Sequence, residues 1–125
     1  MKTRTSPPLR LLAALLVGAF AAAAPAQAST AQKLKPAVLV VHIKDYTFKP
    51  AAATIHTGDT VTFINDDEDA HTVRAARGDF DSGGLDTNDA WQYTFKTPGQ
   101  HDYFCELHPS MKGTLFVVPA TRKGK

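Results

Sequence analysis

Short strand-like segments separated by turn signals fill the chain between residues 38 and 118. They are rich in Val, Thr, Ile, Tyr and Phe, and several alternate apolar with polar residues, which is the pattern of a half-buried β-strand. The turn signals are TGD, NDDED, RGDFDSGG and TPGQ. Because no stretch of this region carries a long apolar helical stripe, the pattern predicts a small all-β fold, an antiparallel sandwich or barrel. The expected strands cover residues 38–43, 53–56, 60–65, 71–75, 91–95, 101–104 and 113–118.

The longest gap between expected strands, residues 76–89, is rich in glycine and is expected to be a crossover loop. The strand that follows alternates Trp91, Tyr93 and Phe95 with polar residues. We expect these three rings to belong to the core and not to contact a cofactor.

The N-terminus has the order of a secretory signal peptide. Three basic residues within the first ten precede an apolar run at 11–24, and the small-x-small sequence AQA follows at 26–28. A bilayer-spanning helix needs about 20 apolar residues, so a cleaved signal is favoured over a retained membrane anchor. We therefore expect export to the periplasm.

Removal of the signal peptide changes the charge balance. It takes away three of the 14 basic residues and none of the acidic ones, which leaves 11 basic and 12 acidic residues. A near-neutral chain gives no argument for nucleic acid as a partner, and we expect a monomer without a membrane span. The expected organisation is a signal peptide at 1–28, a leader at 29–36, one domain at 37–118 and a basic tail at 119–125.

Cys105 is the only cysteine in the chain. It cannot form an internal disulfide, and a free thiol is a liability in an oxidising compartment unless it is buried or bound. His108 and Met111 follow it at steps of three in the segment YFCELHPSM. A thiolate with imidazoles suits Cu, Zn or Fe, and a thioether shifts the choice toward copper because zinc seldom takes methionine. The segment therefore predicts three ligands of a copper site.

A second histidine ligand has to come from elsewhere in the chain. His42 and His56 lie in or at the end of expected strands, far from any other donor. His101 opens a strand that would place its ring roughly 13 Å from Cys105 in an extended chain. His71 begins a strand directly after the polar loop NDDEDA, where two loops at one end of a sandwich can meet. On placement alone His71 is preferred, and the other three remain open.

Four segments resemble the cupredoxins, the small blue copper proteins. The resemblance extends from about Val38 to Val118, and it implies a Greek-key β-sandwich with the metal under one end. The short gap between His108 and Met111 is most similar to the amicyanin and amicyanin-like plastocyanin branch, since other branches usually place more residues there. The segments are F-x-P at 48–50, IHTGDTVTFIN at 55–65, AHTV at 70–73 and DYFCELHPSMKGTLFV at 102–117.

The resemblance also implies a role for each candidate ligand. His71, Cys105 and His108 are then the strong equatorial ligands of one copper ion that alternates between Cu(I) and Cu(II). Met111 is the weak axial ligand. Because protein donors fill all four positions, no position is open to a substrate, and the expected activity is one-electron transfer by a protein that is not an enzyme.

Neighbours of the ligands are expected to tune the site. Thr72 stands where the family often has Asn or Ser after the first histidine ligand, and its hydroxyl is a candidate brace between the two loops. Asn65 is a second candidate brace. Glu106 replaces the Thr or Ser that commonly follows the cysteine, so we expect the local hydrogen bonding to differ from the family there.

Residues around the expected copper end are candidate partner contacts. An acidic rim is expected to steer a basic redox partner, such as a cytochrome or a periplasmic dehydrogenase or other oxidoreductase. A solvated acidic turn without a partner fits the same residues about as well. The candidate contacts are Asp66, Asp67, Glu68 and Asp69 before His71, with Leu107 and Pro109 beside His108.

Two other functions fit parts of the pattern. A periplasmic copper-binding or copper-delivery protein would serve copper homeostasis, but this chain lacks the Met-rich or His-rich tracts that such proteins often carry. A thiol nucleophile built from Cys105 and a histidine requires an open cleft and an oxyanion site, of which the sequence gives no sign. The sequence favours the electron carrier over both.

Overall fold

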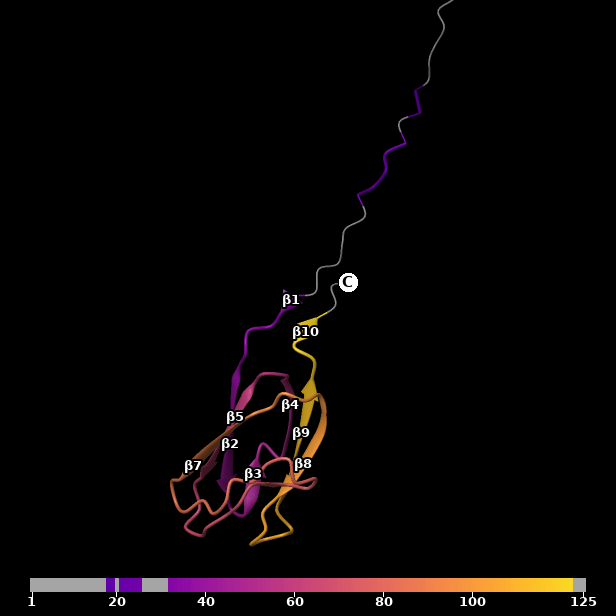
Figure 1. The fold of residues 1–125 in the computed structure, drawn as a ribbon. Coiled ribbons are helices and arrows are strands. Elements are labelled where there is room, and N and C mark those ends of the chain that lie inside the picture. The colour runs from indigo at the N-terminus through magenta and orange to yellow at the C-terminus, as the bar shows by residue number, and fades with distance from the viewer. Residues whose placement is uncertain (1–17, 20, 26–31, 123–125) are drawn as a thin grey trace, which may run out of the picture.

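Two four-stranded sheets pack face to face in the computed structural model, which describes residues 18–19, 21–25 and 32–122 (Figure 1). The strands are β1 (Gln32–Lys33), β2 (Val38–Lys44), β3 (Thr47–Lys49), β4 (Ala52–His56), β5 (Thr60–Asn65), β6 (Arg74–Ala75), β7 (Ala90–Thr94), β8 (Gly99–Phe104), β9 (Lys112–Val118) and β10 (Thr121–Arg122). One sheet has the order β3-β2-β5-β7, the other β4-β9-β8-β6, and β1 pairs with β10. The prediction of an all-β sandwich is confirmed.

The sheets are mixed, and in this respect the expectation of an antiparallel sandwich is wrong. β2 pairs with β5 and β4 with β9 in parallel, whereas the other pairings are antiparallel. The chain changes sheets between β3 and β4 and changes back between β4 and β5, so β5 returns to the sheet of β2 and lies beside it. Alternation within one strand shows which face is buried but not which sheet the strand joins.

The core lies between the two sheets. Tyr103 on β8 packs across it against Phe63 on β5, with ring centroids 5.4 Å apart. Of the aromatic residues expected in the core, Phe95 is buried, and Trp91 and Tyr93 are partly buried against it. Burial of each such ring stabilises the fold by about 1.5–3 kcal/mol, so the core holds the sheets together and gives the loops at their ends a fixed base.

Residues 71–73 are not the start of a strand, contrary to expectation. Only β6 remains of the expected strand 71–75, because residues 71–73 bond to the crossover loop and not to a neighbouring strand. His71 and Leu85 exchange backbone hydrogen bonds of 3.0 and 2.7 Å, and the Val73 N–H donates to Ser82 Oγ at 2.8 Å. The crossover loop therefore fixes the backbone of His71.

Three short strands were not expected. β3 pairs with β2 in a tight hairpin, and β1 pairs with β10 inside the segments expected to be a leader and a tail. Strands of two or three residues are too short for a periodic pattern to identify. The expected signal peptide lies largely outside the described residues, and within the described part no helix is long and apolar enough to cross a membrane.

Asp59, the last residue of the TGD turn, holds this turn in place with its side chain. Its buried carboxylate accepts the N–H groups of Ala37 at 2.7 Å and His56 at 2.8 Å. Burial alone would raise the pKa of Asp59, but these two hydrogen bonds and the nearby His56 imidazole hold it below its ordinary value of 3.8. The ionised side chain thus ties the start of β2 to the turn between β4 and β5.

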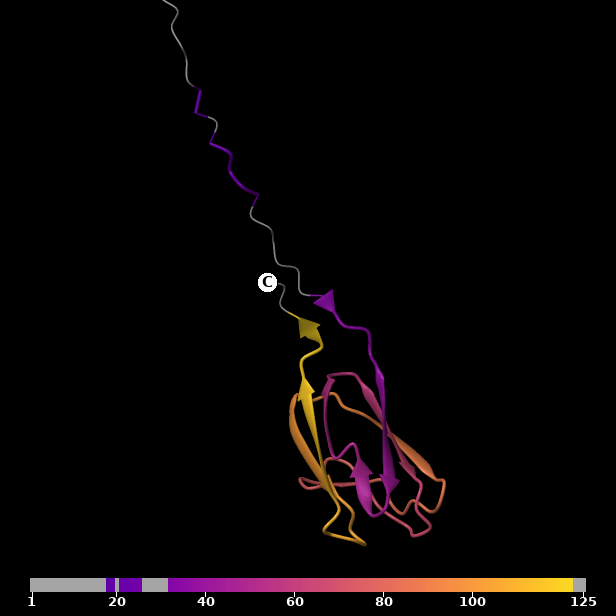
Figure 2. The ribbon, with the colours of Figure 1, turned by 180° about the vertical axis from the view of Figure 1, so that it is seen from behind.

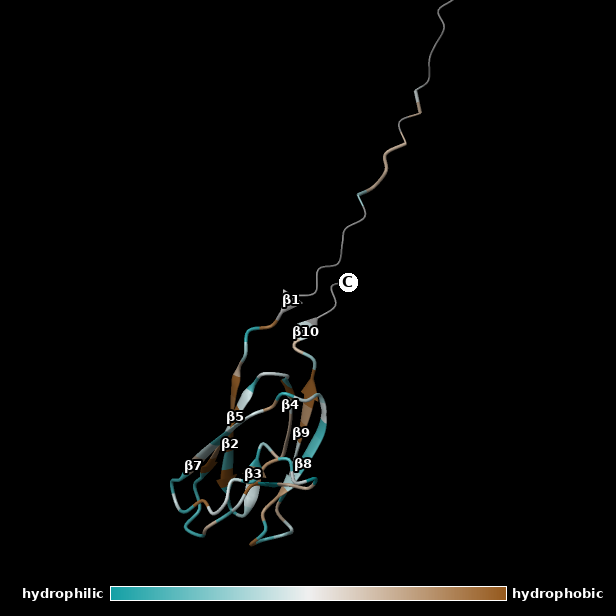
Figure 3. Cartoon of the chain, in the orientation of Figure 1, coloured by the Kyte–Doolittle hydropathy of each residue, from teal (hydrophilic) through white to brown (hydrophobic). Residues whose placement is uncertain are grey.

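The two ends of the sandwich differ in what they carry. β1 and β10 lie beyond one end, and the loops that follow β5 and β8 lie at the opposite end (Figures 1 and 2). Parts of β2 and β9 are hydrophobic, while much of β8 is hydrophilic (Figure 3). Some of the apolar residues face outward, including Val38 on β2 and Phe116 on β9. The candidate ligands all belong to the end away from β1 and β10.

Candidate metal centre

Two loops at one end of the sandwich bring His71, Cys105 and His108 together, with ligand atoms all within 4.8 Å of one another. Cys105 Sγ lies 3.7 Å from His71 Nδ1 and 3.8 Å from His108 Nδ1. The two Nδ1 atoms are 3.2 Å apart. Three nitrogen and sulfur donors therefore point at one shared position, as the ligands of a metal ion do.

Met111 closes the loop that carries Cys105 and His108. The Cys105 N–H donates to the Met111 carbonyl at 3.1 Å, and the Met111 N–H donates to the His108 carbonyl at 2.8 Å. Met111 is buried, with 3% of its surface exposed. These backbone bonds bring Met111 back beside Cys105, between β8 and β9.

The donors differ in their access to solvent. Cys105 and His71 have no exposed surface, whereas His108 is half-buried. A substrate cannot reach the Cys105 sulfur, which disfavours the thiol-nucleophile alternative. The imidazole of His108 is the part of the donor set that reaches the protein surface.

The other histidines lie away from this cluster. His42 Nδ1 lies 2.6 Å from Asp66 Oδ2 at the surface, His56 lies beside Asp59, and His101 Nε2 lies 2.8 Å from a backbone carbonyl. Of the four candidates for the second histidine ligand, the structure brings only His71 to Cys105.

Thr72 joins the two loops at the sulfur atom. Its N–H donates to Cys105 Sγ at 3.3 Å, and its hydroxyl oxygen lies 3.9 Å from the same sulfur and accepts the Glu106 N–H at 2.8 Å. An N–H directed at sulfur shares the negative charge of a thiolate ligand. Thr72 thus occupies the position that the expected brace requires.

The Glu106 side chain bonds to Arg74 and not to Cys105. Its carboxylate accepts a hydrogen bond from Arg74, which also lies 3.8 Å from Asp81, and only the Glu106 N–H takes part in the bonding near sulfur. Whether the hydrogen bonding here differs from that of the family stays a prediction. Exposed ion pairs of this kind contribute little to stability, about 0–1 kcal/mol.

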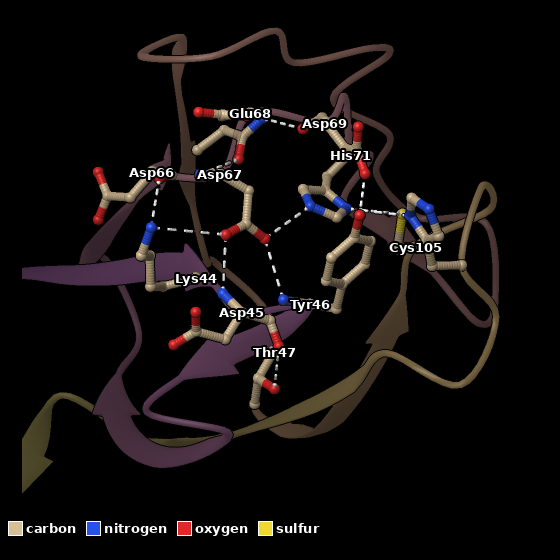
Figure 4. A network of polar contacts seen from close by, with 12 residues as sticks. Lys44, Asp45, Tyr46, Thr47, Asp66, Asp67, Glu68, Asp69, His71 and Cys105 are labelled. Carbon is tan, nitrogen blue, oxygen red and sulfur yellow. Dashed lines mark hydrogen bonds and ion pairs between the residues drawn. The ribbon is translucent and has the colours of Figure 1, made fainter.

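Asp67 lies inside the protein, unlike the rest of the acidic run (Figure 4). It is 7% exposed, and its Oδ2 lies 2.9 Å from His71 Nε2. Its two oxygens also accept the N–H groups of Asp45 at 2.7 Å and Tyr46 at 2.9 Å, with Lys44 Nζ 3.9 Å away. A proton held on Nε2 leaves Nδ1 free to face Cys105. Asp67 is therefore not available as a partner contact.

Asn65 braces the same loop from the end of β5. It has no exposed surface. Its amide donates to the carbonyls of Asp69 at 2.8 Å and Leu85 at 2.9 Å, and its oxygen accepts the Asp67 N–H at 3.0 Å. The expected brace thus ties the loop before His71 to the crossover loop.

The remaining candidate partner contacts all have surface open to solvent. Asp66 is partly exposed, and Glu68, Asp69 and Pro109 are exposed. Leu107 exposes 56% of its surface. Asp69, which accepts the Tyr46 hydroxyl, and the chain neighbours Leu107 and Pro109 therefore lie near the half-buried His108.

Tyr46 is a site residue that the sequence did not identify. Its ring centroid lies 4.9 Å from that of His108 and 5.4 Å from that of His71, and its hydroxyl donates to Asp69. The residue belongs to the turn between β2 and β3, far from both ligand segments in sequence. Its position two residues before the F-x-P segment is the only local signal, and it does not indicate a contact with the ligands.

One thiolate, two imidazoles and a neighbouring thioether fit one copper ion. Cu(I) accepts soft sulfur donors, Cu(II) accepts imidazole, and this mixed set serves both states. The set lacks the carboxylate and carbonyl ligands that Mg²⁺ and Ca²⁺ prefer. The donors present therefore match a redox metal that alternates between Cu(I) and Cu(II).

Comparisons with known proteins agree with this geometry. A family model described as a cupredoxin-like domain matches residues 11–117. Amicyanin-alpha of Methylorubrum extorquens is 31% identical over 110 residues, which cover 84% of this chain and 86% of that protein. Amicyanin of Paracoccus versutus is 34% identical over 84 residues, but the match covers 63% of this chain and 64% of that protein. Its crystal structure superposes with a TM-score of 0.58 at 28% identity, over 65% of this chain and 81% of the other.

Proposed function

Because the chain belongs to the cupredoxin family and is similar to its amicyanin branch, we propose that it carries single electrons between redox proteins in the periplasm. The observation that carries the proposal is the convergence of the donor atoms of His71, Cys105 and His108 on one point. His71, Cys105 and His108 are the strong copper ligands, and Met111 is the weak fourth ligand. Residues 1–28 act as the export signal, and the domain at 37–118 is the working unit.

The surroundings of the donors suit electron transfer. Bound copper supplies a couple that exchanges one electron. Thr72 and Asn65 donate hydrogen bonds and the Asp67 carboxylate accepts them, and these bonds hold the two loops in place, so little of the protein has to move when the charge of the site changes. His108 reaches the surface beside Leu107, and electrons enter and leave there.

The test is to add Cu(II) to the purified protein and record its visible spectrum. We expect an intense thiolate-to-copper band that is absent in Cys105→Ser, because the serine oxygen cannot replace the sulfur. His101→Gln is the matched control and should keep the full band, since its imidazole bonds to Thr97 and lies away from the site. A colourless protein that retains zinc would overturn the proposal.

Copper delivery in copper homeostasis is the alternative role for the same site. A delivery protein should lose copper to an acceptor during repeated oxidation and reduction, whereas a carrier should keep it. Buried donors favour retention of the metal. Cycles of ascorbate and ferricyanide followed by copper analysis separate the two roles.

The exposed acidic residues before His71 favour a redox partner with a basic surface, such as a basic cytochrome. In the double variant Asp66→Asn with Glu68→Gln, the second-order rate of electron exchange with a basic cytochrome at low salt should fall by about threefold or more. The rate should also depend less on ionic strength. Asp79→Asn is the matched control, because Asp79 lines a hollow with Lys96 and Thr97, away from the ligand loops. Equal salt dependence in both variants would exclude steering.

A further inference from the structure

Tyr46 covers the outer side of the two candidate imidazoles. Its ring stands nearly perpendicular to both, at 87° to His108 and 88° to His71, with centroid distances of 4.9 and 5.4 Å. Perpendicular aromatic contacts at this distance are favourable. Three separate segments therefore meet here, namely the turn after β2, the loop after β5 and the loop after β8.

The backbone of Tyr46 is held in a conformation that a tyrosine rarely adopts. Asp45 and Tyr46 have φ values of 53° and 55°, the left-handed pair of a two-residue hairpin turn, where Asn and Gly are preferred. The buried carboxylate of Asp67 accepts both of their N–H groups and also contacts His71 Nε2. One carboxylate thus fixes the turn that carries Tyr46 and one of the rings that Tyr46 covers.

The side chain of Tyr46 is also anchored at its far end. Its hydroxyl donates to Asp69, and 47% of the residue remains exposed. The ring therefore lies between solvent and the imidazoles, held by Asp67 on one side and Asp69 on the other (Figure 4).

The two imidazoles depend on Tyr46 to different degrees. His71 is buried, and Asp67 holds its Nε2. His108 is half-buried, and among the described residues its side-chain hydrogen bonds all involve Nδ1, the atom that faces Cys105 and His71. Its neighbours in the loop, Leu107 and Pro109, are exposed. Apart from the other candidate ligand His71, whose ring centroid also lies 4.9 Å away, Tyr46 is thus the aromatic residue that restrains the His108 ring.

We propose that Tyr46 is a lid over the metal centre, a positioning residue that keeps the His108 ring turned toward Cys105 and keeps external ligands away from both imidazoles. The proposal rests on the proposed function for the identity of the metal. The placement of the rings by Tyr46 is a property of the chain itself and can be measured without metal.

The decisive variant is Tyr46→Asn. Asparagine tolerates positive φ better than tyrosine does, so this variant removes the ring without straining the turn. Tyr46→Phe keeps the ring and loses only the hydroxyl. Phe116→Ala removes a similarly exposed ring, 43% against 47%, from the outer face of β9, and it serves as the matched control.

The first measurement uses copper-free protein and imidazole NMR signals. In Tyr46→Asn the His108 signals should broaden because the ring samples several positions, while the His71 signals, although shifted by loss of the tyrosine ring current, should stay as sharp as in the wild type. In Tyr46→Phe and Phe116→Ala both rings should behave as in the wild type. His108 signals as sharp in Tyr46→Asn as in the wild type would overturn the proposed restraint.

The second measurement uses copper-loaded protein and the rate at which excess bicinchoninate removes Cu(I). The rate should rise about tenfold in Tyr46→Asn, a factor equivalent to about 1.4 kcal/mol, and should stay within about threefold of the wild type in Tyr46→Phe. Equal rates in Tyr46→Asn and Phe116→Ala would overturn the proposed barrier to external ligands. If the wild type shows no thiolate-to-copper band, the proposed function fails, while the NMR measurement still decides whether Tyr46 is a lid.

Discussion

Asp67→Ala is expected to lower the free energy of unfolding of the copper-free protein by about 3–5 kcal/mol, because it removes a buried acceptor from three N–H groups at once. These groups belong to Asp45, Tyr46 and the His71 ring. Denaturant unfolding monitored by circular dichroism measures the change. Since the same substitution releases His71 Nε2, copper affinity should also fall by about 10–100-fold, which a competition titration measures.

Two further variants test this explanation of the Asp67 effect. Asp67→Asn keeps one acceptor oxygen but turns an NH₂ group toward one of the donors, so we expect about half of the loss of stability. Glu68→Ala changes an exposed side chain one position away and should alter stability by less than about 0.5 kcal/mol. If Asp67→Ala and Glu68→Ala have equal effects, the buried network does not stabilise the loop.

The part of the site that is contiguous in the chain could be predicted from the sequence. Cys105, His108 and Met111 lie within seven residues, and their side-chain chemistry is specific enough to indicate copper without a structure. Prediction of His71 required further evidence, because it lies 34 residues before Cys105 in the sequence. Its place after a polar loop and the family resemblance together identified it, and the structure brings it to the cysteine.

The residues that hold the candidate ligands in place could not be predicted, because their contacts join segments that are distant in sequence. Asp67 and its neighbours form one acidic run in the sequence, yet Asp67 turns inward to bond to Tyr46, 21 residues earlier, while Glu68 stays exposed. Charge alone does not show which carboxylate will be buried. Tyr46 likewise reaches the ligands only because β2 and β3 form a hairpin beside them.

In the fold, too, local features could be predicted from the sequence and long-range contacts could not. Alternation identified β5 and β9 well, since each is long enough for its buried face to form a repeated pattern. It did not identify β3, nor the parallel pairing of β2 with β5, because pairing depends on how the two sheets close around the core. The local sequence pattern predicts the strands, whereas packing of the core determines which strands pair.

Gly113→Ala is expected to destabilise the protein by about 3 kcal/mol through overpacking. Gly113 lies directly opposite Tyr103 in the β8·β9 pairing, and an added Cβ would overlap Cζ, Cε2 and the hydroxyl oxygen of the tyrosine ring. Tyr103 is 2% exposed and packs against Phe48 and Phe63, so these contacts oppose displacement of its ring. Burial also raises the pKa of Tyr103, so its phenol stays neutral.

Denaturant unfolding of two glycine variants and a double-mutant cycle test this explanation. Gly84→Ala is the matched control and should change stability by less than about 0.5 kcal/mol, because nothing lies within 4 Å of a Cβ built there. In a Tyr103→Leu background the clash disappears, so Gly113→Ala should then cost at least ~2 kcal/mol less than it does alone. Equal costs in the two backgrounds would show that Tyr103 does not require a glycine beside it. A large coupling would show that the tyrosine fills the space left by the glycine, two residues after Met111, and so fixes the strand on which the ligand loop ends.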